Sequence, residues 1–103
     1  MADKIKVLTK RPGCIPRSVW VTNSLENLQN YVAGPIETVT LGKDLVVICN
    51  EEGRIHGMPH NCVIGGVDLC GNIIIAGVAE DEFSDIPFEV KEMKLLFPQL
   101  WRV

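Results

Sequence analysis

Two short segments are apolar on both faces of an extended chain, and they constrain the fold most strongly. The first is L-V-V-I-C at residues 45–49, and the second is N-I-I-I-A-G-V at residues 72–78, which is apolar after its first residue. A strand without polar alternation is typical of the interior of a sheet. We therefore expect two buried strands here, with residues 45–49 at a central position.

Other segments alternate polar and apolar residues, which predicts half-buried strands. These segments are residues 4–10, 17–21 and 36–41. Between the first two lies R-P-G-C-I-P-R, whose prolines and glycine predict a loop. The N-E-E-G sequence at residues 50–53 is typical of a turn, and residues 54–58 are predicted to pair back across it.

Two helices are predicted. The first follows Asn23, a predicted cap, with Glu26 three residues later as in a capping box. Its apolar side consists of Leu25, Leu28 and Val32, and a Gly-Pro step ends it.

The second helix is predicted within residues 83–98, with Ser84 or Asp85 as cap, Pro87 in its first turn and Pro98 at its end. The resulting order is β-β-α-β-β-β-β-α. It predicts an α+β fold, a mainly antiparallel sheet with both helices packed on one side, because strands and helices do not alternate as a parallel sheet requires.

Length and composition predict one folded domain over residues 1–103, in a size range where oligomerisation adds useful stability. Its longest apolar run is too short to span a bilayer, and its start does not resemble a secretory signal, so no membrane contact is expected. We expect a cytoplasmic protein whose cysteines are reduced thiols: Cys14, Cys49, Cys62 and Cys70.

Charge is distributed unevenly although the net charge is only −3. Residues 1–20 are rich in lysine and arginine, and residues 80–92, the acidic segment, are rich in aspartate and glutamate. The net charge argues against binding to long nucleic acid. Each run could be a solvated face, the basic one could receive a phosphate or carboxylate, or the two could meet across subunits.

Zinc is one hypothesis for the segment C-N-E-E-G-R-I-H-G-M-P-H-N-C at residues 49–62. His56 and His60 have the spacing of a helical zinc motif. Gly57 and Pro59 lie between them, however, and both residues disfavour a helix. Cys49 ends an apolar strand, where a free cysteine behaves as a small hydrophobe. We therefore expect no metal.

Catalysis is also not expected. Glu51 and Glu52 are adjacent, so their carboxylates diverge, whereas paired catalytic carboxylates must face each other across a substrate. No nucleophile-base pattern or glycine-rich phosphate loop stands out. We predict a non-enzymatic protein without catalytic residues or cofactors.

Ligand binding is the remaining hypothesis. Arginine and lysine bind phosphates and an exposed tryptophan can stack on a base, although a strand tryptophan more often belongs to a core or interface. We predict a pocket edge formed by the basic loop (residues 10–17), the tryptophan beside it, and polar groups of residues 50–61. Its residues are Lys10, Arg11, Arg17, Trp20, Asn50, Glu51, Arg54, His60 and Asn61.

Four sequence elements resemble one family: N-E-E-G-R-I-H-G-M-P-H-N (residues 50–61), the P-G-x-x-P loop (residues 12–16), the N-S-L-E-N-L-Q helix start and the G-P-I-E step (residues 34–37). The chain resembles, over nearly its whole length, the domain of unknown function 3846, a family of small proteins of phages, plasmids and integrative elements, mostly of Gram-positive bacteria. His60 and Cys62 depart from the family pattern, which weakens the zinc hypothesis further.

The resemblance implies a mobile-element accessory protein in the cytoplasm of a host bacterium. Such proteins often counter host defence, and we expect an oligomer that sequesters a small anionic ligand, such as a cyclic nucleotide or a cyclic ADP-ribose-type signal. One alternative is an inhibitor that binds a host defence protein through its acidic face. Another is a metal-dependent enzyme that uses residues 49–62.

Overall fold

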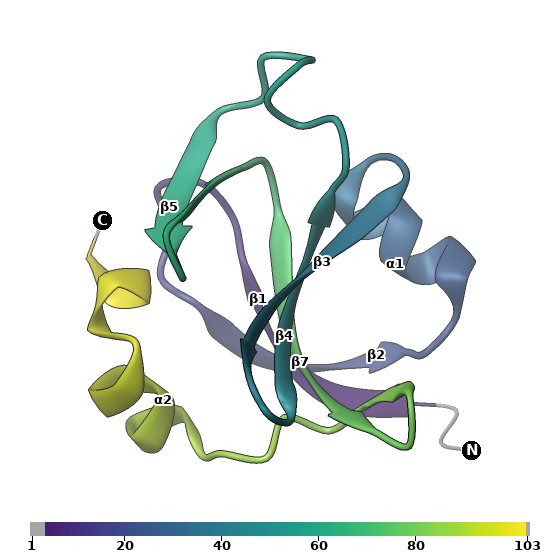
Figure 1. Cartoon of the computed structure of the whole chain (residues 1–103), viewed down its shortest axis with the longest axis vertical. Coiled ribbons are helices and arrows are strands. Elements are labelled where there is room, and N and C mark those ends of the chain that lie inside the picture. The colour runs from purple at the N-terminus through teal and green to yellow at the C-terminus, as the bar shows by residue number, and fades with distance from the viewer. Residues whose placement is uncertain (1–3, 103) are drawn as a thin grey trace.

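The computed structural model describes residues 4–102, and an antiparallel β-sheet runs through the middle of the molecule (Figure 1). Its strands lie in the order β2-β1-β7-β4-β3, and β8 also pairs with β7. The strands are β1 (Lys4–Lys10), β2 (Arg17–Thr22), β3 (Ile36–Gly42), β4 (Leu45–Asn50), β7 (Ile73–Ala79) and β8 (Glu82–Ser84). The expected interior place of β4 is confirmed, since all six of its residues are buried. The mainly antiparallel α+β fold is confirmed as well.

One face of the sheet is covered by α1 (Leu25–Val32). Ser24 caps this helix, because its Oγ accepts a hydrogen bond from the Asn27 backbone N–H at 3.1 Å. The predicted cap was wrong by one residue: Asn23 instead donates to the Phe83 carbonyl. Leu28 is buried against the sheet together with Val32, whereas Leu25, predicted on the same side, is exposed.

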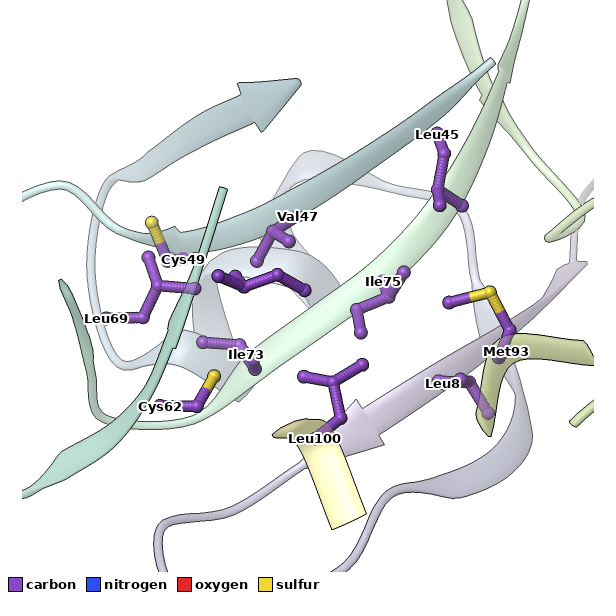
Figure 2. Close-up of a cluster of buried hydrophobic side chains, with 11 residues drawn as sticks. Leu8, Leu45, Val47, Cys49, Cys62, Leu69, Ile73, Ile75, Met93 and Leu100 are labelled. Carbon is purple, nitrogen blue, oxygen red and sulfur yellow. The ribbon is translucent and has the colours of Figure 1, made fainter. Parts of the chain in front are cut away.

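The opposite face is covered by the hairpin of β5 (His60–Ile64) and β6 (Val67–Cys70), by α2 (Val90–Leu96) and by the 3-10 helix η1 (Pro98–Trp101). Figure 2 shows the apolar cluster between these elements and the sheet. The prediction that both helices lie on one side is therefore wrong. The strands β1 and β7 have apolar residues on both faces of the sheet, so each face needs its own cover.

The strand predicted at residues 54–58 is absent from the described chain, which forms a series of turns over residues 51–57. Gly57 has a φ of +66° and Pro59 follows shortly after, so the chain bends where a strand would have to stay extended. The β5–β6 hairpin was not predicted. Its turn consists of Gly65 and Gly66, both with positive φ, which suits the twist of a two-residue hairpin.

The second helix begins later than predicted. Ser84 lies in β8 and Asp85 accepts a hydrogen bond from the Lys6 backbone N–H, so neither caps a helix. The cap is Glu89, which forms a capping box with Glu92. Residues 85–89 thus connect the sheet edge to the opposite face before the helix starts.

Candidate functional site

A cleft lies between the sheet edge at β3 and the hairpin β5–β6. Its volume is about 520 Å³, within the range of about 300–1,000 Å³ that is typical of small-molecule sites. The walls come from β3, the end of β4, the loop after β4 and β6. Apolar groups that line it are Val39, Ile55, Val67 and Leu69. The cleft combines an apolar lining with a polar rim, as small-ligand sites commonly do.

The charged groups of the cleft are mostly acidic. Glu37, Glu51 and Asp68 contribute three carboxylates, whereas Arg54 contributes one guanidinium. All four residues are exposed, so their charges are available to a ligand. A ligand with several hydrogen-bond donors and one anionic group suits this lining better than a polyanion.

Asn50 holds the loop that carries Glu51 and Arg54. Its Nδ2 donates to the Val32 carbonyl at 3.0 Å, and its Oδ1 accepts from the Glu52 backbone N–H at 2.7 Å. The residue is buried, with 6% of its surface exposed. Asn50 therefore ties the end of α1 to the loop, and its side-chain amide already bonds to backbone groups.

Gly53 brings the same loop close to β6. A Cβ at Gly53 would lie 3.0 Å from the Cys70 carbonyl oxygen, so a larger residue would push the loop and the strand apart. The N-E-E-G sequence predicted a turn, and a turn is present. Two of its residues, Asn50 and Gly53, shape the loop, while Glu51 faces the cleft.

Lys10 and Asn61 form a buried pair between β1 and β5. Lys10 is 1% exposed, and its Nζ donates to Asn61 Oδ1 at 2.9 Å. The Nδ2 of Asn61 donates to the carbonyls of Lys10, at 3.0 Å, and Gly71, at 2.8 Å. These two predicted ligand residues bond to each other and fasten the hairpin to the sheet.

The predicted site residues Arg11, Arg17 and Trp20 lie away from the cleft, at or next to the opposite edge of the sheet. Arg17 and Trp20 belong to β2, at the edge opposite β3, and Arg11 precedes this strand in the loop (Figure 1). Positions 17 and 20 are three apart along the strand, so their side chains leave opposite faces of it. Of the nine predicted site residues, the structure brings three together along the cleft: Asn50, Glu51 and Arg54.

The histidines and cysteines of residues 49–62 do not gather around one point. His56 lies 3.7 Å from Glu52 in the loop after β4, whereas Cys49 and Cys62 belong to the apolar cluster of Figure 2. Burial, with a smaller contribution from the charge of Glu37, raises the pKa of the Cys49 thiol to about 11.

Burial also raises the pKa of Cys62, an effect that Lys10 opposes and Asp68 reinforces. Both thiols are therefore protonated at neutral pH. A protonated thiol is a poor metal ligand and a poor nucleophile.

His60 instead faces a different set of residues. Its Nδ1 lies 2.7 Å from Asp68 Oδ1, and Cys70 lies directly across the hairpin. We refer to His60, Asp68 and Cys70 as the hairpin trio. Two of its members line the cleft. Asp68, Cys70 and Glu37 were not among the predicted site residues. The Gly65-Gly66 turn was the signal that could have placed His60 opposite Cys70.

No helix within residues 4–102 is long and apolar enough to cross a membrane. The search of curated proteins found no match to the chain, and neither did the search of solved structures. A profile of the family described as "Domain of unknown function (DUF3846)" matches residues 5–98, from β1 to the first residue of η1. The match spans the cleft, the loop after β4 and the hairpin, and the chain belongs to the DUF3846 family.

Proposed function

We propose that the protein is a non-enzymatic phage or mobile-element accessory protein that counters host defence by sequestering a small nucleotide signal in the cleft. The observation that supports this best is the cleft itself, which combines about 520 Å³ of volume, an apolar lining and one arginine among carboxylates. Sequestration in the bacterial cytoplasm requires binding alone.

The basic, acidic and apolar side chains of the cleft can each bind a different part of a nucleotide. Arg54 can donate two parallel hydrogen bonds to a phosphate, and the carboxylates of Glu51 and Asp68 can accept hydrogen bonds from the amino and imino groups of a base. Ile55 is 82% exposed at the cleft and can cover the base or ribose. The excess of carboxylates favours a ligand with few phosphates and argues against a polyphosphate.

An oligomer forms part of the same proposal. The strands β2 and β3 are the two ends of the strand order, so each offers an edge that can pair with a second copy. An assembly through β2 would leave the cleft beside β3 open. Native mass spectrometry of the purified chain measures the subunit number.

Thermal denaturation in the presence of single ligands tests the proposal. The probes are cyclic AMP, cyclic GMP, cyclic di-AMP and cyclic ADP-ribose, each added to the wild type, to Arg54→Ala and to Arg17→Ala. We expect at least one probe to raise the Tm of the wild type and of Arg17→Ala, but not that of Arg54→Ala. Stabilisation that is lost in Arg17→Ala and kept in Arg54→Ala would move the site to the basic loop.

A second candidate function is inhibition of a host protein through the acidic segment. Glu80 and Asp81 have φ values of +52° and +64°, an unfavourable backbone conformation for residues other than glycine. They lie at the exposed turn between β7 and β8, and Glu82 follows.

An exposed acidic turn suits a basic surface on the partner. The test is binding to a purified host defence protein. Conversion of Glu80, Asp81 and Glu82 to lysine should abolish this binding, whereas Glu26→Lys on α1 should leave it unchanged.

A further inference from the structure

The outer face of the hairpin β5–β6 brings three metal-ligand side chains to one point. His60 pairs with Cys70 in the register, and Asp68 lies two residues before Cys70, on the same face of β6. The ligand atoms of the hairpin trio all lie within 4.8 Å of one another. We propose that the hairpin trio binds one zinc-type divalent ion.

A β-bulge creates this arrangement. The register shifts between His60 and Cys62, so that Asn61 is an extra residue in β5. Because of the bulge, Asn61 and Cys62 are both buried, while His60 and Val63 are exposed. Without the bulge, strict alternation would place His60 and Cys62 on the same face of the hairpin. His60 could then not be exposed while Cys62 is buried. Bulges commonly re-aim side chains beside functional sites.

The hairpin backbone is held in place before any ion binds. Asn61 is fixed by Lys10 Nζ and by the carbonyls of Lys10 and Gly71. The Gly71 backbone N–H in turn donates to the Pro59 carbonyl at 2.8 Å, which joins the two ends of the hairpin. His60 adjoins Asn61 and Cys70 adjoins Gly71, so two of the three ligands are next to fixed positions.

The chemistry of the donors selects the class of ion. Imidazole nitrogen, carboxylate oxygen and thiolate sulfur are the ligands that zinc uses. Magnesium and calcium prefer oxygen throughout. Three protein ligands leave one tetrahedral position for water or another ligand, as in zinc sites that keep an open position. Asp68 and Cys70 both line the cleft, so this position lies at the cleft wall.

Binding requires small movements and the release of one proton. In a tetrahedral zinc site the ligand atoms lie about 3.5 Å apart, given bond lengths of about 2.0–2.3 Å. The His60 and Asp68 atoms, now 2.7 Å apart, must separate by less than about 1 Å, and their exposed side chains are free to rotate. Neutral His60 coordinates through Nδ1 with its proton on Nε2, and the Cys70 thiol loses its proton to solvent as it binds.

Titration of the reduced full chain with zinc, and separately with cobalt, tests the site without any nucleotide and so does not depend on the proposed function. We expect one ion per chain and, with cobalt, the near-ultraviolet charge-transfer absorption of a thiolate ligand. Cys70→Ser should remove this absorption. Cys70→Ser, Asp68→Asn and His60→Gln should each lower zinc affinity by at least about tenfold, since loss of an outer-shell partner alone costs about 10- to 100-fold.

The matched control is Cys14→Ser, which removes an exposed cysteine in the loop between β1 and β2. It should keep the absorption and the affinity. Circular dichroism of each variant separates a loss of ligand from a loss of fold, and Asp68→Asn provides a second variant if Cys70→Ser unfolds. Failure of the wild type to bind one ion, or thiolate absorption that persists in Cys70→Ser, would overturn the proposal.

Discussion

The two faces of the sheet are covered in different ways. On the face of the sheet that α1 covers, the contacts at the centre are apolar. There Leu28 and Val32 pack against side chains of β1, β4 and β7. The opposite face also has an apolar cluster (Figure 2). There, however, the hairpin is fastened by the buried pair of Lys10 and Asn61.

This difference explains where the candidate sites lie. A helix that packs directly on a sheet fills the space beneath it. The hairpin instead pairs only with itself, and a cleft remains between it and β3. The cleft and the hairpin trio are both built on the element that polar bonds hold in place. Both candidate sites thus lie on the face where the buried Lys10–Asn61 pair fastens the hairpin to the sheet.

The largest expected effect is that of Asn61→Ala. The substitution leaves the buried Lys10 Nζ and the Gly71 carbonyl without their side-chain partner, and each buried polar group left unsatisfied costs about 1–3 kcal/mol, more where it is charged. We expect the free energy of unfolding, measured by urea denaturation, to fall by at least about 3 kcal/mol. Asn72→Ala, which removes a single bond to the Tyr31 carbonyl, should cost about 1 kcal/mol. Equal losses in the two variants would contradict the special role of the Lys10–Asn61 pair.

Leu28→Ala tests the apolar face and should cost about 3 kcal/mol, because it leaves a cavity beneath α1. Leu25→Ala, at an exposed position of the same helix, should change stability by less than about 0.5 kcal/mol. At temperatures where the variants are folded, neither should alter zinc affinity. If Leu28→Ala weakened zinc binding by tenfold, the two faces would not be independent.

Cys49 gives a smaller effect that depends on pH. Its folded-state pKa of about 11 exceeds the ordinary value of 9.0, so between these values the folded state keeps a proton that the unfolded state has lost. Stability is therefore highest below about pH 9 and falls as pH rises toward 11, by at most about 1.4 kcal/mol per pH unit from this group.

Urea denaturation at several pH values measures this dependence. Cys49→Ala should flatten the decline in that window relative to the wild type, whereas Cys14→Ala, at an exposed thiol, should leave it unchanged. An unchanged slope in Cys49→Ala would show that the thiol titrates normally.

The α1 face was largely predictable from the sequence. Strand alternation, the continuous apolar run at residues 45–49 and the helical spacing of Leu28 and Val32 are local patterns, and they gave the correct strands β1 to β4 and the correct helix. Leu25 has the same spacing but lies in the first turn of the helix and is exposed. Local periodicity predicts which side of a helix is apolar, but it does not predict which residues on that side are buried against the sheet.

The other face was less predictable because its geometry arises from long-range contacts. The bulge at Asn61 interrupts the alternation of β5, so the hairpin has no regular period in the sequence. A lysine is ordinarily expected at the surface. The burial of Lys10 depends on a partner that is 51 positions away in the sequence. The basic loop looked like a phosphate site because its charges are close in sequence, yet the cleft lies at the other edge of the sheet.

The most direct test of the central claim is to map a bound nucleotide on the chain by NMR. The backbone amide spectrum of the wild type is recorded during titration with whichever of the four cyclic nucleotides raises its Tm. If the nucleotide binds in the cleft, the amide signals of Gly53, Arg54 and residues 67–70 should shift progressively during the titration. The amide signals of residues 11–20 should not move. Shifts centred on Arg17 and Trp20, or no shift with the nucleotide that raises the Tm, would contradict a nucleotide site in the cleft.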